Sequence, residues 1–339
     1  MYPDFSYILH DLFGTPVDNF TAIVKTFGLF LALAFLASAY LLRLELKRKA
    51  AQGLFQTTTI KDDAGNFVEA YPHDRVADIT MIAGISGILG AKIFAMLESA
   101  SSIRNFMSDP IHYFFSGSGL AIYGGLIGGF IGVYWFIYKK LKMNPLYMMD
   151  AVAPALMIGY AVGRIGCQLS GDGDWGIVAG HLPQGWFLPK WMWAHDFARN
   201  VIHEKGNILP IGVEAITGFD GIYNTRLNPG VYPTPFYETV LAGLLTAFLW
   251  FLRTRLKVAG QLFMVYLVLN GVERFFIEKI RVNDKIHAFG LTFTQAEMIA
   301  VIITIIGIIG YFVLPITQKS KNQSVTENIE NQPIIEEES

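Results

Sequence analysis

The hydrophobic residues of this chain gather in long blocks separated by shorter polar stretches. Each block runs for about 18–22 residues, which at about 1.5 Å per helical residue matches a hydrocarbon core about 30 Å thick. We interpret seven of these blocks as membrane-spanning helices, at about 21–42, 77–98, 117–138, 146–166, 237–252, 260–278 and 295–316. The pattern therefore predicts an all-α polytopic membrane protein.

Composition supports this class and excludes others. The 339 residues are 53% hydrophobic and only 16% charged, with a mean hydropathy of +0.40, whereas an average soluble domain is about 25% charged. These values exclude a disordered chain and an ordinary soluble enzyme. The formal net charge of −2 argues against a nucleic-acid partner, and the single cysteine, Cys167, excludes an internal disulfide.

The basic residues of the loops predict how the helices are oriented. The loops after the first, third and fifth spans, together with the C-terminal tail, hold fourteen Lys and Arg, and the opposite side holds eight. Short cytoplasmic loops are enriched in basic residues. We therefore expect the N-terminus to face outward and the C-terminus to face the cytoplasm.

Three stretches are expected outside the seven-span membrane domain, which covers residues 1–316 with its loops. Residues 170–236 hold four of the six tryptophans, and this outward loop region between the fourth and fifth spans should lie at the level of the lipid headgroups. Residues 54–71 carry two β-branched runs around the sequence DAGN, which indicates a small cytoplasmic hairpin. The polar, acidic tail at 317–339 lacks periodicity and is expected to be disordered.

Glycines recur at four-residue spacing in the third predicted span. Gly124, Gly128 and Gly132 fall on one helix face, with Gly125 beside them. Small residues at this spacing let helix backbones approach closely in lipid. We interpret most of these glycines as packing positions, which name no function by themselves.

Charged residues within the spans need a reason, because a charge at the bilayer centre costs at least about 2.5–3.5 kcal/mol. In the sixth span, Arg274, Glu278 and Arg281 have the i, i+4, i+7 spacing of one helix face. Two interpretations stay open. The three residues form a salt-bridge ladder that satisfies itself, or they form a phosphate site, since an arginine fork matches phosphate oxygens.

Two further charged clusters stand at helix ends that the predicted orientation places outward. Arg164 lies between glycines and is followed by the Gly-rich acidic run that holds Asp172 and Asp174. Glu238 follows a run of Pro and Tyr at the entrance to the fifth span. The alternatives are an arginine that snorkels to the interface and an aromatic anchor with a solvated glutamate. Together with Arg274, these residues suit an anionic phospholipid headgroup.

Several blocks resemble the prolipoprotein diacylglyceryl transferase family and occur in its order. They are GLAIYGGLIGG at 119–129, an acid at Asp150, GRIGCQLSGDGDWG at 163–176, YPTPFYE at 232–238, ERFFIEKIR at 273–281, and Thr294-Gln295 at the start of the last span. One such block would be weak evidence. Their order along a seven-span chain makes the resemblance specific.

The resemblance implies a reaction in the bacterial cytoplasmic (inner) membrane. A diacylglyceryl group would pass from phosphatidylglycerol to the thiol of the lipobox cysteine in a prolipoprotein signal peptide, and glycerol phosphate would leave. No cofactor and no metal are expected. The implied catalytic residues are Tyr123, Arg164, Glu238 and Arg274. The implied phosphatidylglycerol-binding residues are Gly124, Gly125, Arg164, Asp172, Gly176, Arg274, Glu278 and Arg281.

The chain departs from the family pattern at several informative positions, three of which concern candidate site residues or their neighbours. Tyr123 and Tyr232 stand where relatives often have histidine, and Cys167 stands where they often have asparagine. A tyrosine ionises near pH 10 and is a poor base, so we expect Tyr123 to position substrate and leave the base unassigned. Cys167 is expected to be a packing residue. The competing hypothesis is an anion or lipid transporter that uses the same arginines, although the paired halves typical of transporters are not evident.

Overall fold

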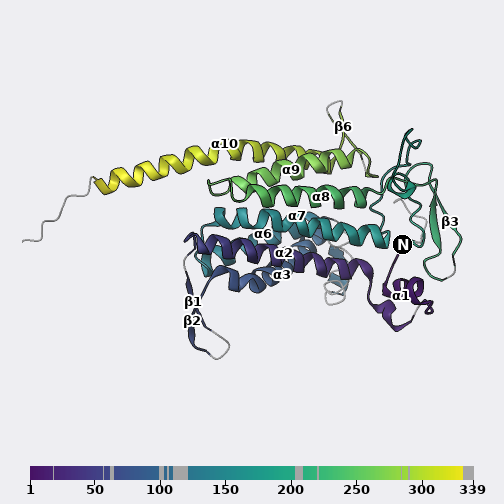
Figure 1. Ribbon diagram of the computed structural model, residues 1–339, viewed down its shortest axis with the longest axis horizontal. Helices are drawn as coiled ribbons and strands as arrows, with labels where there is room; N and C mark the ends of the chain where they lie inside the picture. Colours follow the sequence, from purple (N-terminus) through teal and green to yellow (C-terminus); the bar gives the residue numbers. More distant parts are fainter. Residues whose placement is uncertain are drawn as a thin grey trace, which may run out of the picture. The chain divides into compact units, whose positions relative to one another are not determined.

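The computed structural model describes residues 1–17, 19–55, 57–61, 65–98, 103–104, 107–109, 121–202, 209–219, 221–283, 285–288 and 291–330. Helices dominate these residues, and the described strands form three antiparallel pairs (Figure 1). The chain divides into two compact units. The larger unit comprises Met1–Ser38 and Ala153–Ser339, and the smaller unit comprises Ala39–Val152.

The larger unit is built on the helices that carry the predicted site. They are α7 (Pro145–Ser170, from Ala153 onward), α8 (Thr234–Leu252), α9 (Gln261–Glu278) and α10 (Gln295–Glu330). Met157 of α7, Ala242 and Leu249 of α8 and Leu262 of α9 pack in one buried apolar cluster. α9 also packs against α10, where a Cβ on Gly271 would lie 2.7 Å from the carbonyl oxygen of Ala300. These contacts fix α8 and α9 against α7.

Local sequence signals explain where these helices begin. α8 starts inside the Pro-rich run, with proline in its first turn, where the missing N–H costs nothing. α10 begins with a reciprocal cap at Thr294 and Glu297. The Glu297 N–H donates to Thr294 Oγ1 at 3.1 Å, and the Thr294 N–H donates to Glu297 Oε2 at 3.0 Å.

The remaining elements of the larger unit are short. They are α1 (Phe5–Phe13), the 3₁₀ turns at Phe20–Ile23 and Lys190–Met192, the first half of α2 (Thr26–Ala51), β3 (Glu214–Thr217), β4 (Thr225–Asn228), β5 (Lys285–Ala288) and β6 (Leu291–Thr294). β3 pairs with β4, and β5 pairs with β6. Trp175 and Phe197, with ring centroids 5.3 Å apart, form a second buried apolar cluster with Val231.

The smaller unit contains the second half of α2, a 3₁₀ turn at Pro72–Arg75, α3 (Val76–Glu98), α6 (Ile122–Trp135) and a π-helical turn at Phe136–Lys140. α3 and α6 approach very closely at glycines. A Cβ on Gly90 would overlap the carbonyl oxygen of Gly124, and one on Gly128 would overlap that of Ser86. Gly124 and Gly128 therefore act as packing positions, because any larger residue would push the helices apart.

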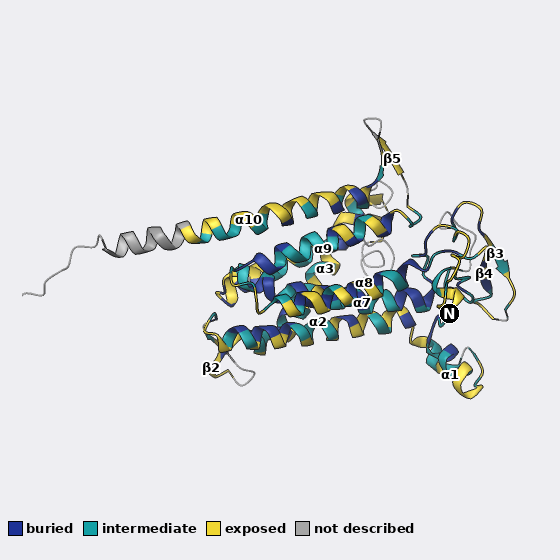
Figure 2. Cartoon of the chain, turned by 45° about the horizontal axis from the view of Figure 1, so that its top comes forward, coloured by how far each residue is buried: buried dark blue, intermediate teal, exposed yellow. Residues whose placement is uncertain are grey.

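Five helical stretches within the described residues are long and apolar enough to cross a membrane. They are Thr26–Ala51, Pro72–Leu97, Pro145–Ser170, Thr234–Leu252 and Gln295–Lys319. Much of α10 is exposed (Figure 2). Its exposed apolar residues include Ile305, Ile309 and Phe312. The protein is thus a mostly helical polytopic membrane protein. The third and sixth predicted spans coincide with helices α6 and α9, but α6 is 14 residues long and α9 carries three charged residues.

Two segments outside the spans also have defined backbone. β1 (Thr58–Lys61) pairs with β2 (Phe67–Ala70) in an antiparallel hairpin. α10 continues to Glu330, so residues 317–330 are helical where we expected disorder. This stretch contains neither glycine nor proline to end the helix, which explains the difference. Residues 331–339 of the expected disordered tail lie outside the described part of the chain.

Candidate functional site

Arg164 anchors the predicted site near the C-terminal end of α7. Its Nε lies 2.8 Å from Oε2 of Glu238, and its Nη1 forms an ion pair with Asp174. The guanidinium also lies over the Tyr160 ring, 5.2 Å from the centroid. Only 15% of the Arg164 side chain is exposed, so this arginine is held inside the protein and does not snorkel to an interface.

Glu238 is the acceptor that three arginines share. It stands in the first two turns of α8 and is fully buried. Besides Arg164, Nη1 of Arg274 lies 3.3 Å from its Oε1, and Nη1 of Arg281 lies 3.4 Å from the same oxygen. The interpretation of Glu238 as a solvated residue beside an aromatic anchor is therefore wrong. Its charge is compensated by guanidiniums that come from α7, from α9 and from the segment after α9.

Arg274 joins α8 to the end of α9. Its second amino group, Nη2, lies 2.9 Å from Oε2 of Glu278, one turn further along the helix. Glu278 is buried and also accepts a 2.5 Å hydrogen bond from Nδ2 of Asn283. The salt-bridge interpretation holds for the i, i+4 pair, but Arg274 also pairs with Glu238 outside its own helix. The phosphate-site interpretation stays a prediction.

Arg281 also pairs with Glu238, but from the segment after α9 and not from the helix face that was predicted. α9 ends at Glu278, so Arg281 is not on the helix face with Arg274. Instead it forms an isolated antiparallel bridge with Gly176, and its Nη2 lies 2.6 Å from Oδ1 of Asp174. The helical spacing named the right residue for an incorrect structural reason, since the helix stops one turn earlier.

Asp174, which was not among the predicted site residues, is the acid of the Gly-rich run that pairs with the arginines. It bridges Arg164 and Arg281. Burial alone would raise the pKa of Asp174, but the two guanidiniums outweigh burial and hold it below its usual value. Asp172 pairs with neither arginine; its carboxylate accepts a 3.4 Å hydrogen bond from the Asp174 N–H. Burial, followed by the charge of Asp174, raises the pKa of Asp172.

The backbone explains why Asp174 faces the arginines. Gly171 and Gly173 have φ values of +64° and +97°, which side-chain-bearing residues rarely adopt, so the run turns sharply on both sides of Asp172. Gly176 then passes so close to the end of α9 that a Cβ would lie 2.6 Å from the carbonyl oxygen of Ile280. Thr234 Oγ1 donates a 2.6 Å hydrogen bond to the Asp174 carbonyl. Gly176 thus serves the site by allowing three segments to meet.

We call Arg164, Asp174, Glu238, Arg274, Glu278 and Arg281 the arginine cluster. It contains three guanidiniums and three carboxylates, all in the larger unit. Charge-assisted pairs of this kind are strong only when both partners are fixed, as they are here. Each arginine spends two nitrogens on these carboxylates. The remaining N–H donors can bind oxygens of an anionic ligand.

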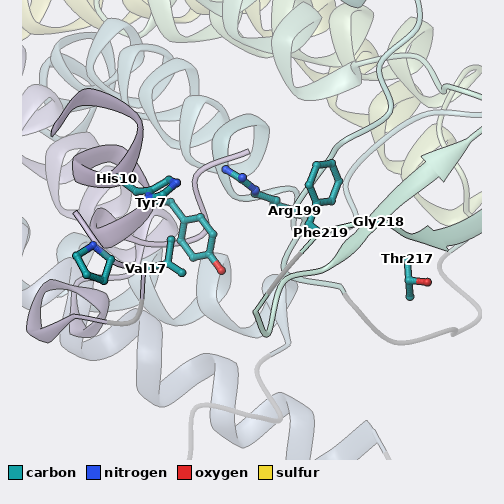
Figure 3. Close-up of a pocket in the computed structure, with 8 residues that line it drawn as sticks. Tyr7, His10, Val17, Arg199, Thr217, Gly218 and Phe219 are labelled. Atoms are coloured by element: carbon teal, nitrogen blue, oxygen red, sulfur yellow. The ribbon is translucent and has the colours of Figure 1, made fainter. Parts of the chain in front are cut away.

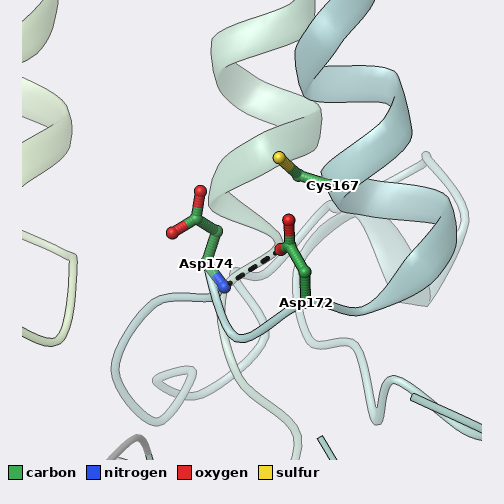
Figure 4. Close-up of side chains that lie close together, drawn as sticks. All are labelled: Cys167, Asp172 and Asp174. Atoms are coloured by element: carbon green, nitrogen blue, oxygen red, sulfur yellow. Dashed lines mark hydrogen bonds between the residues drawn. The ribbon is translucent and has the colours of Figure 1, made fainter. Parts of the chain in front are cut away.

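Cys167 lies beside the cluster without belonging to it. Ligand-type atoms of Cys167, Asp172 and Asp174 fall within 4.8 Å of one another (Figure 4). Asp174 is already neutralised by two guanidiniums, which would repel a cation, so we assign no metal to this group. Cys167 is buried, and its sulfur accepts a weak 3.8 Å contact from Nη1 of Arg164. These contacts agree with a packing role.

The glycine-rich segment with Tyr123 belongs to the smaller unit. Tyr123, Gly124 and Gly125 stand in the first turn of α6. Gly124 packs against α3, whereas a Cβ on Gly125 would meet its nearest neighbour only at 3.5 Å. The Tyr123 side chain lies outside the described part of the structure. The role of these three residues toward a lipid therefore stays a prediction.

Tyr232, the second tyrosine at a position where relatives often have histidine, has a structural partner. Its hydroxyl oxygen accepts a 3.0 Å hydrogen bond from the Gly180 N–H. Its ring lies 5.3 Å from that of Trp193 in an edge-on arrangement. Tyr232 therefore helps to hold residues 176–180 against the start of α8.

A cavity of about 710 Å³ opens elsewhere in the larger unit (Figure 3). Tyr7 and His10 of α1 line it from one element, and Arg199 and Phe219 line it from the segment between α7 and α8. None of the predicted site residues lines this cavity. Arg199 is occupied there by Asp11, at 3.6 Å, and by the Tyr7 ring. The cavity and the arginine cluster therefore share no lining residue.

Comparison with known proteins decides the family. A sequence model described as "Prolipoprotein diacylglyceryl transferase" matches residues 19–313. This chain belongs to the prolipoprotein diacylglyceryl transferase family. The matched range includes all six residues of the arginine cluster, so the cluster lies within the part of the chain that the family shares.

Curated members of the prolipoprotein diacylglyceryl transferase family are similar over most of their length. A phosphatidylglycerol–prolipoprotein diacylglyceryl transferase of Clostridium tetani is 27% identical over 301 residues, which cover 89% of this chain and 94% of that protein. The protein of the same name from Clostridioides difficile is 30% identical over 252 residues, covering 74% of this chain and 81% of that protein. The resemblance expected from the motifs is confirmed.

Proposed function

We propose that this chain transfers the diacylglyceryl group of phosphatidylglycerol to a cysteine thiol of a prolipoprotein, and that the arginine cluster is the place where the phosphate leaves. Family membership supports the transferase activity. The observation that supports the site is the convergence of Arg164, Arg274 and Arg281 on the buried Glu238 carboxylate. Such fixed positive charge suits a reaction in which a phosphate departs.

The proposed reaction forms one bond and breaks one. The substrate thiol loses its proton, and the thiolate sulfur attacks the glyceryl carbon that is bonded to the phosphate oxygen. The carbon–oxygen bond breaks, its electron pair stays on that oxygen, and glycerol phosphate leaves. Guanidiniums held in a site that excludes water stabilise the growing negative charge without having to reorganise.

The exposure of the carboxylates indicates where a phosphate would enter the arginine cluster. Glu238 and Glu278 are buried, whereas 33% of the Asp174 side chain is exposed. A phosphate group that replaces Asp174 would meet both Arg164 and Arg281. Arg274 would keep its pairs with Glu238 and Glu278 and would add its remaining donors from the side. Asp174 is in this proposal the carboxylate that gives way to the lipid.

We also propose the finer membrane arrangement that the loop charges predict. The chain crosses the bacterial cytoplasmic membrane seven times, with α6 and α9 included, its N-terminus outward and its C-terminus in the cytoplasm. The arginine cluster then lies at the outer leaflet, where a prolipoprotein signal peptide with a lipobox cysteine has access to it. Tyr123, Gly124 and Gly125 would position substrate, and Asp172 would support the turn that carries Asp174.

A transfer assay tests the proposal. Purified protein in vesicles that contain labelled phosphatidylglycerol and a lipobox peptide should produce labelled diacylglyceryl peptide and free glycerol phosphate. The matched control is a peptide with serine in place of the cysteine, which should give neither product. Folded protein that yields no product above a protein-free control would refute the enzyme, and movement of phosphatidylglycerol without transfer would favour a transporter.

A further inference from the structure

A buried carboxylate beside the arginine cluster has no role in the reaction described so far. Glu273 immediately precedes Arg274 on α9 and is only 6% exposed. Neither Oε1 nor Oε2 of Glu273 has a hydrogen-bond partner among the described residues. An unpaired buried carboxyl is costly, so a group of this kind in a native site calls for an explanation such as a bound ligand, a water or a catalytic role.

The helix geometry directs Glu273 toward α7 and α8. Gly271 faces α10, and two residues along an α-helix correspond to a rotation of about 200°. Glu273 therefore points away from α10. It shares a face with Tyr266, two turns earlier, and Tyr266 packs against the buried cluster of α7, α8 and α9.

The groups that interact electrostatically with Glu273 come from α7, α8, α9 and the segment after α9. The charge of Glu273 interacts with that of Glu238 on α8, with Arg274 on its own helix, with Arg164 on α7 and with Arg281. The hydroxyls of Tyr160 on α7 and Tyr266 on α9 also interact electrostatically with Glu273. The Tyr160 hydroxyl, like Glu273, is buried with no hydrogen-bond partner in the described structure. Two unpartnered polar groups thus lie near the arginines, on two different helices.

The other carboxylates of the site are already committed. Glu238, Glu278 and Asp174 each form ion pairs with guanidiniums. No described cation forms an ion pair with Glu273 in this structure. Asp172 also lacks an arginine partner, but its carboxylate accepts the hydrogen bond from the Asp174 N–H. Among the described carboxylates near the arginines, Glu273 is therefore the one with neither an ion pair nor a hydrogen bond.

We propose that Glu273 is the general base that removes the proton from the substrate thiol. This inference rests on the proposed transferase function. A carboxylate oxygen of Glu273 accepts the thiol proton while the sulfur forms its bond to the glyceryl carbon, and the phosphate oxygen leaves with the electron pair. The protonated carboxyl then passes its proton to water or to the departing glycerol phosphate, which returns Glu273 to its starting state.

The experiment compares three enzymes on two nucleophiles. Wild type, Glu273→Gln and Glu273→Asp are assayed with labelled phosphatidylglycerol vesicles and with lipobox peptides that carry either cysteine or selenocysteine. A selenol ionises at lower pH than a thiol and therefore needs no base. Glu214→Gln, an exposed position on β3, is the matched control and should match wild type with both peptides.

With the cysteine peptide, Glu273→Gln should lower kcat by about 100-fold or more while the KM for phosphatidylglycerol stays near that of wild type. With the selenocysteine peptide, the same variant should recover most of the lost rate. Glu273→Asp keeps a carboxyl group, so it should retain partial activity with the cysteine peptide and the same direction of selenol rescue, which covers the case in which the Gln variant does not fold.

Equal rate losses with the two peptides, or a Gln variant as fast as wild type, would overturn the role of Glu273. If Tyr123→Phe lost activity with the cysteine peptide and recovered it with selenocysteine while Glu273→Gln did not, the base would be Tyr123 instead. Absence of transfer by the wild-type enzyme would refute the proposed function itself, so the two failures are distinguishable.

Discussion

The arginine cluster and a second buried network, in the smaller unit, use the same kinds of side chain in different ways. The second network, which we call the helix-borne network, consists of Glu45, Arg48, Lys49 and Asp150. Glu45 and Glu238 are both fully buried. Glu45 pairs with Arg48 and Lys49 three and four residues along its own helix, and Lys49 lies 4.0 Å from Asp150.

The two networks differ in how many separate segments they need. Pairs at i, i+3 and i, i+4 form wherever the helix forms, so the helix-borne network largely stabilises itself. The arginine cluster exists only when the end of α7, the Gly-rich run, the start of α8 and the end of α9 meet. It also keeps a partly exposed carboxylate, Asp174. Assembly from distant segments and access for a ligand are what distinguish a candidate site from a structural ion network.

Removing one arginine from each network should give the largest difference. Arg164→Ala is expected to lower kcat by about 100–1000-fold, because a donor aimed at the leaving phosphate is lost. Arg48→Ala removes a guanidinium that pairs with the buried Glu45 and should change the rate by less than about 3-fold. Transfer rates in phosphatidylglycerol vesicles, normalised to folded protein, measure both. Comparable losses in the two variants would remove the distinction between the networks.

Neutralising the central carboxylate should separate the networks in stability. Glu238→Gln leaves three guanidiniums without their shared partner and should cost about 3 kcal/mol of unfolding free energy. Glu45→Gln should cost about 1 kcal/mol, because Lys49 keeps Asp150 and Arg48, partly exposed, can turn to water. Denaturant titration in detergent checks the order, and a larger cost at Glu45 would contradict it.

Replacing each of the two aspartates of the Gly-rich run should change Tm in opposite directions if only Asp174 pairs with the arginines. The pKa of Asp174 is lowered in the folded state, so its contribution to stability exists at neutral pH and is lost on acidification. The pKa of Asp172 is raised, mainly by burial, so its ionised form opposes folding. At pH 7, Asp174→Asn should lower Tm by about 2–4 °C, and Asp172→Asn should leave Tm unchanged or raise it.

The Asp174 difference should shrink as the pH falls below about 4 and through the lowered pKa of this group. The Asp172 difference should shrink at higher pH, as the pH falls through the raised pKa of this group toward about 4. Thermal unfolding of wild type and both variants at several pH values provides the measurement. Shifts of the same sign in both variants would show that Asp174 is not the acid that pairs with the arginines.

The smallest effect is expected at Cys167. Its sulfur touches Arg164 only through a weak 3.8 Å contact, so Cys167→Ala should change kcat by less than about 3-fold. The same vesicle assay, with circular dichroism to verify folding, tests this. A Cys167→Ala variant that folds but is inactive would contradict this prediction and would show that Cys167 is needed for the reaction.

Much of the arginine cluster could be predicted from the sequence, because charge inside a membrane helix is expensive and needs a reason. Arg164, Glu238 and Arg274 can be identified in this way without any knowledge of the fold. Asp174 cannot be distinguished from Asp172 in the sequence, because the turns at Gly171 and Gly173 decide which of the two side chains faces the arginines. Backbone turns of this kind are not visible in residue spacing.

Helical spacing had the complementary weakness for the end of α9. It grouped Arg281 with Arg274 through i+7, although the helix stops at Glu278 and Arg281 arrives through its bridge with Gly176. The same spacing does not include Glu273, which lies on a different face of α9 from Arg274. The helix against which the Glu273 face of α9 packs depends on the arrangement of α8, α9 and α10. That arrangement cannot be read from a single sequence.

The charges of α9 also bear on how the chain enters the bilayer. α9 carries Glu273, Arg274 and Glu278 within 18 residues, and each charge exposed alone to hydrocarbon costs about 2.5–3.5 kcal/mol. A carboxylate partner for Arg274 outside α9 lies on α8, which ends only nine residues before α9 begins. α9 is therefore a poor candidate for insertion by itself. We expect α8 and α9 to enter the bilayer together as a helical hairpin. The ion pair between Arg274 and Glu238 would then first lower the cost of inserting α9 and later hold Arg274 in the arginine cluster.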